Sequence, residues 1–157
     1  TLNVNDTYQM QNLCVFEYGA LGSSDFCSLF TLNEWKGFDY IWDLALYNGY
    51  SFGNPAGRSL GLGYLQELIA RLKGELISVS ESTVNSTMTS NADLFPLNRP
   101  FYLDMTHDFT IVNLLAAASI DYFRKTLTFT SFPPPERNFR VARITPYAAR
   151  FITEKIG

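Results

Sequence analysis

Residues 97–119, LNRPFYLDMTHDFTIVNLLAAAS, contain the only histidine of the chain, His107, and they decide how the rest of the sequence is interpreted. Residues 101–105 are apolar except for one aspartate, and a polar group at 106–108 and a second apolar run at 111–118 follow them. A short continuous apolar run is typical of a buried parallel strand, and a run rich in Leu and Ala favours a helix. We therefore expect a strand, a polar corner and a helix.

The polar corner predicts a ligand site. The carboxyl ends of parallel strands open onto the crevice where α/β proteins bind ligands, which places His107 and Asp108 at that crevice. Thr106 is the expected N-cap of the following helix, and a helix start attracts anions such as phosphate. On position alone, His107 is equally well a core histidine bonded to a carbonyl group. Asp108 is equally well a carboxylate that only complements the helix dipole.

The composition provides one hydrophobic core and excludes several functions. The chain has 157 residues, of which 46% are hydrophobic and 15% aromatic. Its net charge of -3 argues against nucleic-acid binding, which normally uses a basic face. No apolar run approaches the ~20 residues of a membrane-spanning helix. A single histidine and scattered carboxylates lack the spacing of metal ligands, so we expect neither a metal nor a cofactor.

Cysteines and glycosylation sequons favour an oxidising, secretory compartment. The first ten residues lack the basic and apolar regions of a signal peptide, although a processed protein can still be secreted. Asn5 and Asn85 begin sequons, and Asn85 is the better candidate because a Ser/Thr-rich loop surrounds it. Cys14 and Cys27 are expected to form a disulfide. The apolar neighbours expected to bury this bridge are Leu13, Phe16, Phe26 and Leu29.

Two helices are expected in the first third of the chain. The first runs from a cap at Asn5 or Asp6 to about Ala20. The segment 31–47 is the clearest helix, and Gly49 is expected to end it. It opens with a Thr-x-x-Glu capping box and carries apolar residues at helical spacing: Trp35, Phe38, Trp42 and Ala45.

A third helix is expected to begin at Asn54 and Pro55, as N-cap and first helical residue, and to end at Gly74. Its expected buried stripe is Leu65, Leu68, Ile69 and Leu72. The glycines at 57, 61 and 63 do not form a dinucleotide fingerprint, because no apolar strand precedes them and Gln66 replaces the third glycine. Close packing of the backbone is the better interpretation.

The remaining segments are a loop, a strand and a short helix. Residues 78–98 are rich in Ser, Thr and Asn, which indicates an exposed loop. Three prolines at 133–135 indicate a rigid, extended connection. We expect a last strand at 139–144 and a short terminal helix at 147–156.

Taken together, three segments carry a family resemblance: CSLFTLNEWKGFDYIWDLALYNGYSFGNPAG (27–57), GLGYLQELIARL (61–72) and FYLDMTHDFTIVNLLAA (101–117). They resemble, in the same order, the C-terminal half of the fungal secreted histidine acid phosphatases, a family that includes the phytases. The resemblance implies part of an α/β sandwich of the phosphoglycerate-mutase-like kind with a helical cap. Residues 1–53 would belong to the cap and 54–157 to the sheet domain.

The resemblance also implies a reaction. In that family the histidine of an RHGxRxP motif attacks phosphorus, and the His-Asp pair supplies a phosphate-binding histidine and a proton donor. His107 matches the first of these roles and Asp108 the second. The chain contains no RHGxRxP and no other histidine, so the nucleophile must come from outside it. The expected partners are a phosphate monoester and an N-terminal chain of the same precursor that carries RHGxRxP.

A second interpretation is a non-catalytic phosphate-binding or structural fragment, which applies if nothing supplies the nucleophile. Three departures from the phytases weaken the case for a phytate-specific pocket and leave a broader acid phosphatase open beside it. Phe109 stands where fungal phytases commonly have Asn, and Ala45 and Leu46 stand where many have lysines.

Several arginines could each bind phosphate, but we do not assign them to the site, because structural pairing is the commoner role of any one of them. They are Arg58, Arg71, Arg99, Arg140 and Arg143.

Overall fold

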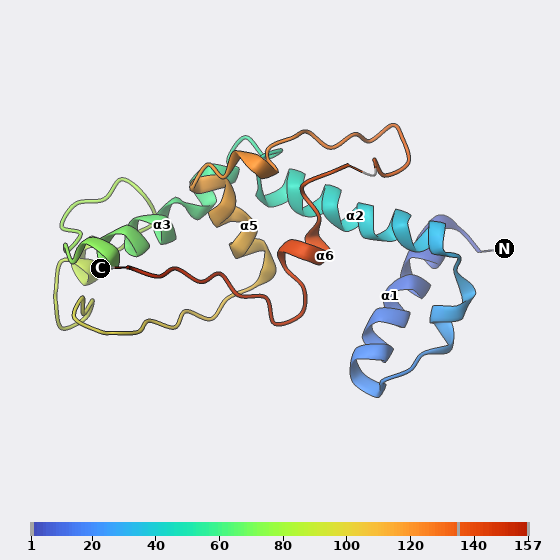
Figure 1. Ribbon diagram of the computed structural model, residues 1–157, viewed down its shortest axis with the longest axis horizontal. Coiled ribbons are helices and arrows are strands. Elements are labelled where there is room, and N and C mark those ends of the chain that lie inside the picture. Colours follow the sequence, from blue (N-terminus) through green and yellow to red (C-terminus); the bar gives the residue numbers. More distant parts are fainter. Residues whose placement is uncertain (1, 135, 157) are drawn as a thin grey trace.

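The long helix α2 runs through the middle of an elongated molecule (Figure 1). The structure is a computed structural model that describes residues 2–134 and 136–156. Every regular element in these residues is helical, and none of their helices is long and apolar enough to span a membrane. In chain order they are α1 (Val4–Leu21), η1 (Asp25–Leu29), α2 (Leu32–Tyr50), α3 (Gly57–Lys73), α4 (Ser86–Thr89), α5 (Asp108–Ala117), η2 (Asp121–Phe123) and α6 (Val141–Ile144).

The start of α2 confirms the predicted capping box. Thr31 Oγ1 accepts a hydrogen bond from the Glu34 backbone N–H (3.4 Å), and Glu34 Oε2 accepts one from the Thr31 N–H (2.7 Å). The Glu34 carboxylate accepts hydrogen bonds from both the hydroxyl and the backbone N–H of Thr31. These bonds hold the pKa of the Glu34 carboxyl below its ordinary value, and the bond from the hydroxyl has the larger effect. The predicted stop at Gly49 is wrong, because α2 continues to Tyr50 and Ser51 is its C-cap.

Two predicted helix starts are displaced along the chain. Helix α1 is capped by Asn3 rather than by Asn5 or Asp6, because Asn3 and Asp6 form the capping box. Helix α3 begins at Gly57, three residues after the predicted cap. The Asn54 side chain instead accepts a hydrogen bond from the Ala56 N–H (2.8 Å), which makes a turn before the helix. The predicted end at Gly74 is confirmed, with a left-handed φ of 75°.

Glycines, not leucines, form the buried face of α3. A Cβ atom on Gly57 would lie 2.0 Å from the Ser51 carbonyl oxygen, and one on Gly61 would lie 2.4 Å from that of Asn113. This confirms close backbone packing as the role of these glycines. The predicted leucine stripe is wrong as the buried face: the buried residues are Gly57, Gly61, Gly63 and Ala70.

The hydrophobic core lies where α2, α5 and the chain after residue 123 meet. Its buried members are Tyr40, Leu46, Tyr47, Val112, Leu127 and Phe139. Two buried tyrosines of α2 also donate hydrogen bonds to the later chain. Tyr40 donates to the Thr128 carbonyl oxygen (2.7 Å) and Tyr47 to that of Arg124 (2.6 Å). Burial raises the pKa of the Tyr47 hydroxyl.

A buried carboxylate joins α2 to the start of α6. Asp43 is fully buried, and it accepts hydrogen bonds from the Val141 N–H (2.7 Å) and from Arg137 Nε. Arg137 also pairs with Asp39 (2.7 Å). Burial raises the pKa of the Asp43 carboxyl, although the hydrogen bonds from Val141 and Arg137 act in the opposite direction.

The two predicted strands are wrong. Residues 101–105 are irregular, and the segment 139–144 contains the short helix α6. The predicted terminal helix at 147–156 is irregular as well. A strand exists only when a neighbouring backbone completes its hydrogen bonds, and neither segment has such a neighbour among the described residues. The α/β sandwich is therefore not seen there, and the division into 1–53 and 54–157 stays a prediction.

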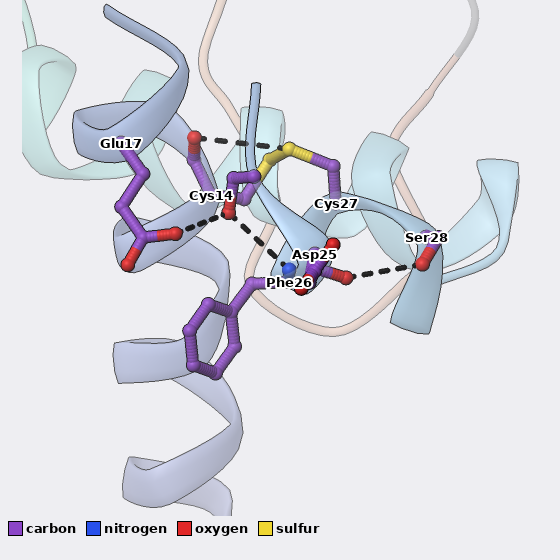
Figure 2. Close-up of a disulfide and its surroundings, with 7 residues drawn as sticks. Cys14, Glu17, Asp25, Phe26, Cys27 and Ser28 are labelled. Atoms are coloured by element: carbon purple, nitrogen blue, oxygen red, sulfur yellow. Dashed lines mark hydrogen bonds between the residues drawn. A yellow bond between two sulfur atoms is a disulfide. The ribbon is translucent and has the colours of Figure 1, made fainter. Parts of the chain in front are cut away.

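The predicted disulfide between Cys14 of α1 and Cys27 of η1 is confirmed (Figure 2). Beside it, Ser24 Oγ donates to a carboxylate oxygen of Glu17 (2.7 Å) and accepts a hydrogen bond from the Phe26 N–H (3.2 Å). Three of the four apolar neighbours expected to bury the bridge are themselves exposed, although Cys14 is buried. The exposed fractions are 41% for Leu13, 72% for Phe16 and 58% for Leu29.

Candidate active site at the start of α5

His107 and Asp108 lie where the irregular segment 101–107 enters α5. His107 is the N-cap, with an extended backbone (φ −103°, ψ 166°), and Asp108 is the first helical residue. Both side chains are exposed. The prediction of Thr106 as the N-cap is wrong by one residue, because the Thr106 hydroxyl donates to the Thr110 hydroxyl oxygen (2.7 Å) instead.

The first turn of α5 uses two of its own N–H groups. The Phe109 N–H donates to Asp108 Oδ1 (2.7 Å), and the Thr110 N–H donates to the His107 carbonyl oxygen (3.1 Å). An anion at this helix start therefore competes with the Asp108 carboxylate for the Phe109 N–H. A protonated Asp108 would both release that N–H and offer a proton.

Helices α2 and α3 fix the position of α5. Ser51, at the end of α2, donates a buried hydrogen bond from its hydroxyl to the Val112 carbonyl oxygen (3.1 Å). Gly61 lets α3 approach the α5 backbone at Asn113. Val112 is fully buried between these contacts. Packing on two other helices thus positions α5.

Alternate residues of the segment 101–107 attach it to α3. Asp104 accepts hydrogen bonds from Arg71 Nη1 (2.5 Å) and from the Tyr64 hydroxyl (3.1 Å). The Arg71 guanidinium also lies over the Tyr102 ring, 5.0 Å from its centroid. Burial, and next the Asp104 carboxylate, raise the pKa of the Tyr64 hydroxyl. These contacts hold the chain that leads into His107.

The intervening residues of the same segment are apolar and point to solvent. The exposed fractions are 73% for Phe101, 73% for Leu103 and 90% for Met105. Alternation of anchored and exposed side chains is the pattern of an extended chain with one face covered. The segment thus presents an apolar face that nothing in the described chain covers.

An aromatic stack, which the sequence analysis did not predict, lies at the site. The His107 ring is stacked on the Phe109 ring, with centroids 5.1 Å apart and planes 7° apart. Phe109 is stacked in turn on Tyr50 (5.1 Å, 26°). The only sequence feature that pointed to this stack was Phe109 in place of the Asn that is common in fungal phytases. Tyr50 lies in a distant part of the sequence and gave no such indication.

The arginines set aside earlier have structural contacts or line a different region. Arg58 donates to the Ser119 hydroxyl (2.6 Å), and Arg71 anchors Asp104. Arg140 and Arg143 line a cavity of about 350 Å³ between α5 and α6, which neither His107 nor Asp108 lines. The backbone N–H of Arg99 donates a hydrogen bond to the Tyr102 hydroxyl (3.3 Å).

Both sequon asparagines are exposed. Asn85 caps α4, where its side chain accepts a hydrogen bond from the Thr87 N–H (3.1 Å), and Asn5 lies in the first turn of α1. Among the described residues, no cluster of three His, Cys, Asp or Glu side chains could hold a metal ion.

Comparison with known proteins identifies the family. The model of the Histidine phosphatase superfamily (branch 2) matches residues 1–157. Phytase A of Aspergillus fumigatus is 36% identical over 157 residues, which cover 96% of this chain and 34% of that protein. Phytase A of Aspergillus oryzae is 36% identical over 98% of this chain, and Phytase A of Neurospora crassa is 31% identical over 99%.

The chain spans about a third of the length of these relatives: 34% of the two Aspergillus proteins and 37% of the Neurospora protein. Within that third, the match covers the predicted His-Asp site as well as the helices that position it. The chain belongs to branch 2 of the histidine phosphatase superfamily.

Proposed function

We propose that this chain is the proton-donating part of a phosphatase that hydrolyses phosphate monoesters. The observation that carries the proposal is the His-Asp pair at the start of α5, in a chain that matches the family along its whole length. Exposed His107 and Asp108 occupy the positive end of a helix whose position other helices fix. Such an end is suited to an anionic phosphate group.

The reaction follows from the chemistry of the two side chains. His107 binds a phosphate oxygen while a nucleophilic histidine from outside this chain attacks phosphorus. As the bond from phosphorus to the leaving oxygen breaks, Asp108 gives its proton to that oxygen and becomes a carboxylate. The carboxylate then takes a proton from water, whose oxygen attacks the phosphohistidine and releases phosphate.

The exposed face of residues 101–105 supports a partner for this site. Phe101, Leu103 and Met105 form an apolar face on an extended segment, and uncovered apolar faces mark interaction sites. We infer that the partner is an N-terminal chain of the same precursor that carries RHGxRxP. A strand of that partner beside 101–105 would complete the sheet of the α/β sandwich.

Two positions of α2 support a broad substrate range. Leu46 lies in the hydrophobic core, and Ala45 is exposed. Because both side chains are apolar, neither position offers a positive charge to the several phosphates of phytate. We therefore propose phosphate monoesters in general as substrates, although the relatives are named phytases.

Extracellular location is the compartment that best fits the chain. Disulfides persist in oxidising compartments, and the structure contains one between Cys14 and Cys27. Both sequon asparagines, Asn85 and Asn5, are exposed and thus accessible for glycosylation. Treatment with a glycosidase should lower the mass of the secreted protein, and an unchanged mass would remove this support.

The test of the proposal is an intact mass spectrum of the natively isolated protein combined with a phosphatase assay. We expect a polypeptide that carries RHGxRxP, either associated with this chain or continuous with it, and hydrolysis of p-nitrophenyl phosphate. A lone species of 17.8 kDa without activity would contradict the proposal and indicate a non-catalytic fragment.

A further inference from the structure

The stack of His107, Phe109 and Tyr50 joins three rings from two helix ends. The 7° angle between the His107 and Phe109 planes makes these two rings parallel. Their centroid distance of 5.1 Å exceeds the thickness of an aromatic ring, so the rings are laterally offset, which is a favourable arrangement. Tyr50 is the last residue of α2, and its ring is stacked on the other end of this set, against Phe109.

The backbone at the start of α5 makes the stack possible. Within a helix, residues two apart do not face each other. In an extended backbone they lie on the same side. His107 is an N-cap with an extended backbone, so residues 107–109 do not follow regular helical geometry, and the His107 ring lies on that of Phe109.

The stack is the contact that orients the imidazole. A functional histidine is commonly oriented by a hydrogen bond from one of its ring nitrogens. His107 forms no side-chain cap, and no other described residue donates to or accepts from its ring. Stacking engages one face of the ring and leaves free the in-plane directions along which its two nitrogens form hydrogen bonds.

We propose that Phe109 and Tyr50 are positioning residues that hold the imidazole of His107 in its phosphate-binding orientation. The inference rests on the proposed function. Tyr50 fixes Phe109 against the end of α2, and Phe109 fixes His107. A mobile imidazole would bind phosphate less well in both the ground state and the transition state, so loss of the stack should affect all leaving groups alike.

The test uses the fact that His107 is the only histidine. Its two carbon-bound ring protons give unique signals in the proton NMR spectrum of this chain. Because the imidazole is stacked with an offset on the Phe109 ring, we expect the signals to be displaced from their positions in the unfolded chain, with the proton nearest the Phe109 face shifted upfield. Phe109→Leu should move them towards the unfolded positions, and Phe109→Tyr should restore them.

Phe123→Leu is the matched control, because Phe123 packs against the same core but its ring makes an edge-to-face contact with Tyr122 and none with His107. It should lose similar core packing without moving the His107 signals. Tyr50→Phe should keep the signals, and Tyr50→Leu should move them partway. Two results would overturn the proposal. One is wild-type His107 signals at the chemical shifts of the unfolded chain, and the other is a folded Phe109→Leu variant whose His107 signals have the wild-type chemical shifts.

Kinetic measurements on the complete phosphatase test whether the stack contributes to phosphate binding and turnover. Phe109→Leu should lower kcat/KM by ~10-fold or more, equally for p-nitrophenyl phosphate and glycerol phosphate, and Phe109→Tyr should restore it. Shifted His107 signals with unchanged kinetics would overturn the positioning role. A complete wild-type protein without phosphatase activity would instead overturn the proposed function, and the NMR result would show whether the stack itself exists.

Discussion

Gly61 lies where α3 passes so close to α5 that a single added methyl group matters. We expect Gly61→Ala to destabilise the protein by ~1–3 kcal/mol, because its Cβ would lie 2.4 Å from the Asn113 carbonyl oxygen and the helices would have to separate. Gly37→Ala is the control: Gly37 is inside α2 with nothing within 4 Å of an added Cβ, and it should stabilise by ~0.5–1 kcal/mol. Urea unfolding measures both, and changes of the same sign would contradict the packing described.

Single residues were predictable where their role is local. The capping box of Thr31 and Glu34 needs only two residues three positions apart, and the structure contains it. The glycines of α3 were correctly interpreted as packing residues. The stack of Phe109 on Tyr50 was not predicted, because the two residues are distant in sequence and either ring alone resembles an ordinary core residue.

At the scale of elements, the buried pair of Arg137 and Asp43 joins α2 to the segment that leads into α6. Arg137→Met should destabilise the protein by ~3–5 kcal/mol at pH 7, because it leaves a fully buried carboxylate without its cation. Thermal unfolding measures the loss. A change below ~1 kcal/mol would mean that Asp43 finds another partner or is protonated already.

The same variant should depend on pH in a defined direction. Burial already raises the folded-state pKa of Asp43 above its ordinary value of ~3.9, and loss of Arg137 should raise it further. A raised carboxyl pKa favours the folded state at low pH, and this benefit is lost as pH rises from the unfolded to the folded pKa. The penalty of Arg137→Met should therefore shrink as pH falls towards 4, and a growing penalty would contradict this assignment.

Helices were easier to predict than strands for a physical reason. A helix completes its hydrogen bonds within its own segment, so α2 and the end of α3 follow from local sequence. The predicted strands at 101–105 and 139–144 require a neighbouring backbone, and none lies beside them in the described chain. The apolar residues of 101–105 are exposed for the same reason, whereas Phe139 is buried by helices instead.

At the scale of the whole molecule, α1 and η1 form one end and depend on the disulfide (Figure 1). Reduction of the bridge between Cys14 and Cys27 should destabilise this end by ~3 kcal/mol, because the unfolded loop of thirteen positions is no longer closed. Thermal unfolding with and without reductant measures the effect. Two reactive thiols in the denatured, unreduced protein would rule the bridge out.

The site as a whole was predicted only in part. The sequence placed His107 and Asp108 at the start of a helix, and the structure confirms that placement. The contacts that hold this start, from Ser51 and Gly61, come from other helices and have no local signature. The proposed function places the nucleophilic histidine outside this chain, which contains one histidine and spans about a third of its relatives.

The most direct test of the central claim is the leaving-group dependence of Asp108→Asn in the complete enzyme. The variant should bind substrate almost normally, because Asn keeps the shape of the side chain and removes charge repulsion with phosphate. Turnover of glycerol phosphate should fall by ~10²–10⁴, the range for losing a general acid, because an alkoxide oxygen needs the proton. Turnover of p-nitrophenyl phosphate should fall much less, because the phenolate leaves unaided.

His107→Ala provides the contrast in the same assay. It should impair both KM and kcat for the two substrates alike, since it removes a phosphate ligand rather than a proton. The account predicts a large difference between substrates for Asp108→Asn and none for His107→Ala. Equal losses on both substrates for Asp108→Asn would contradict the assignment of Asp108 as the proton donor.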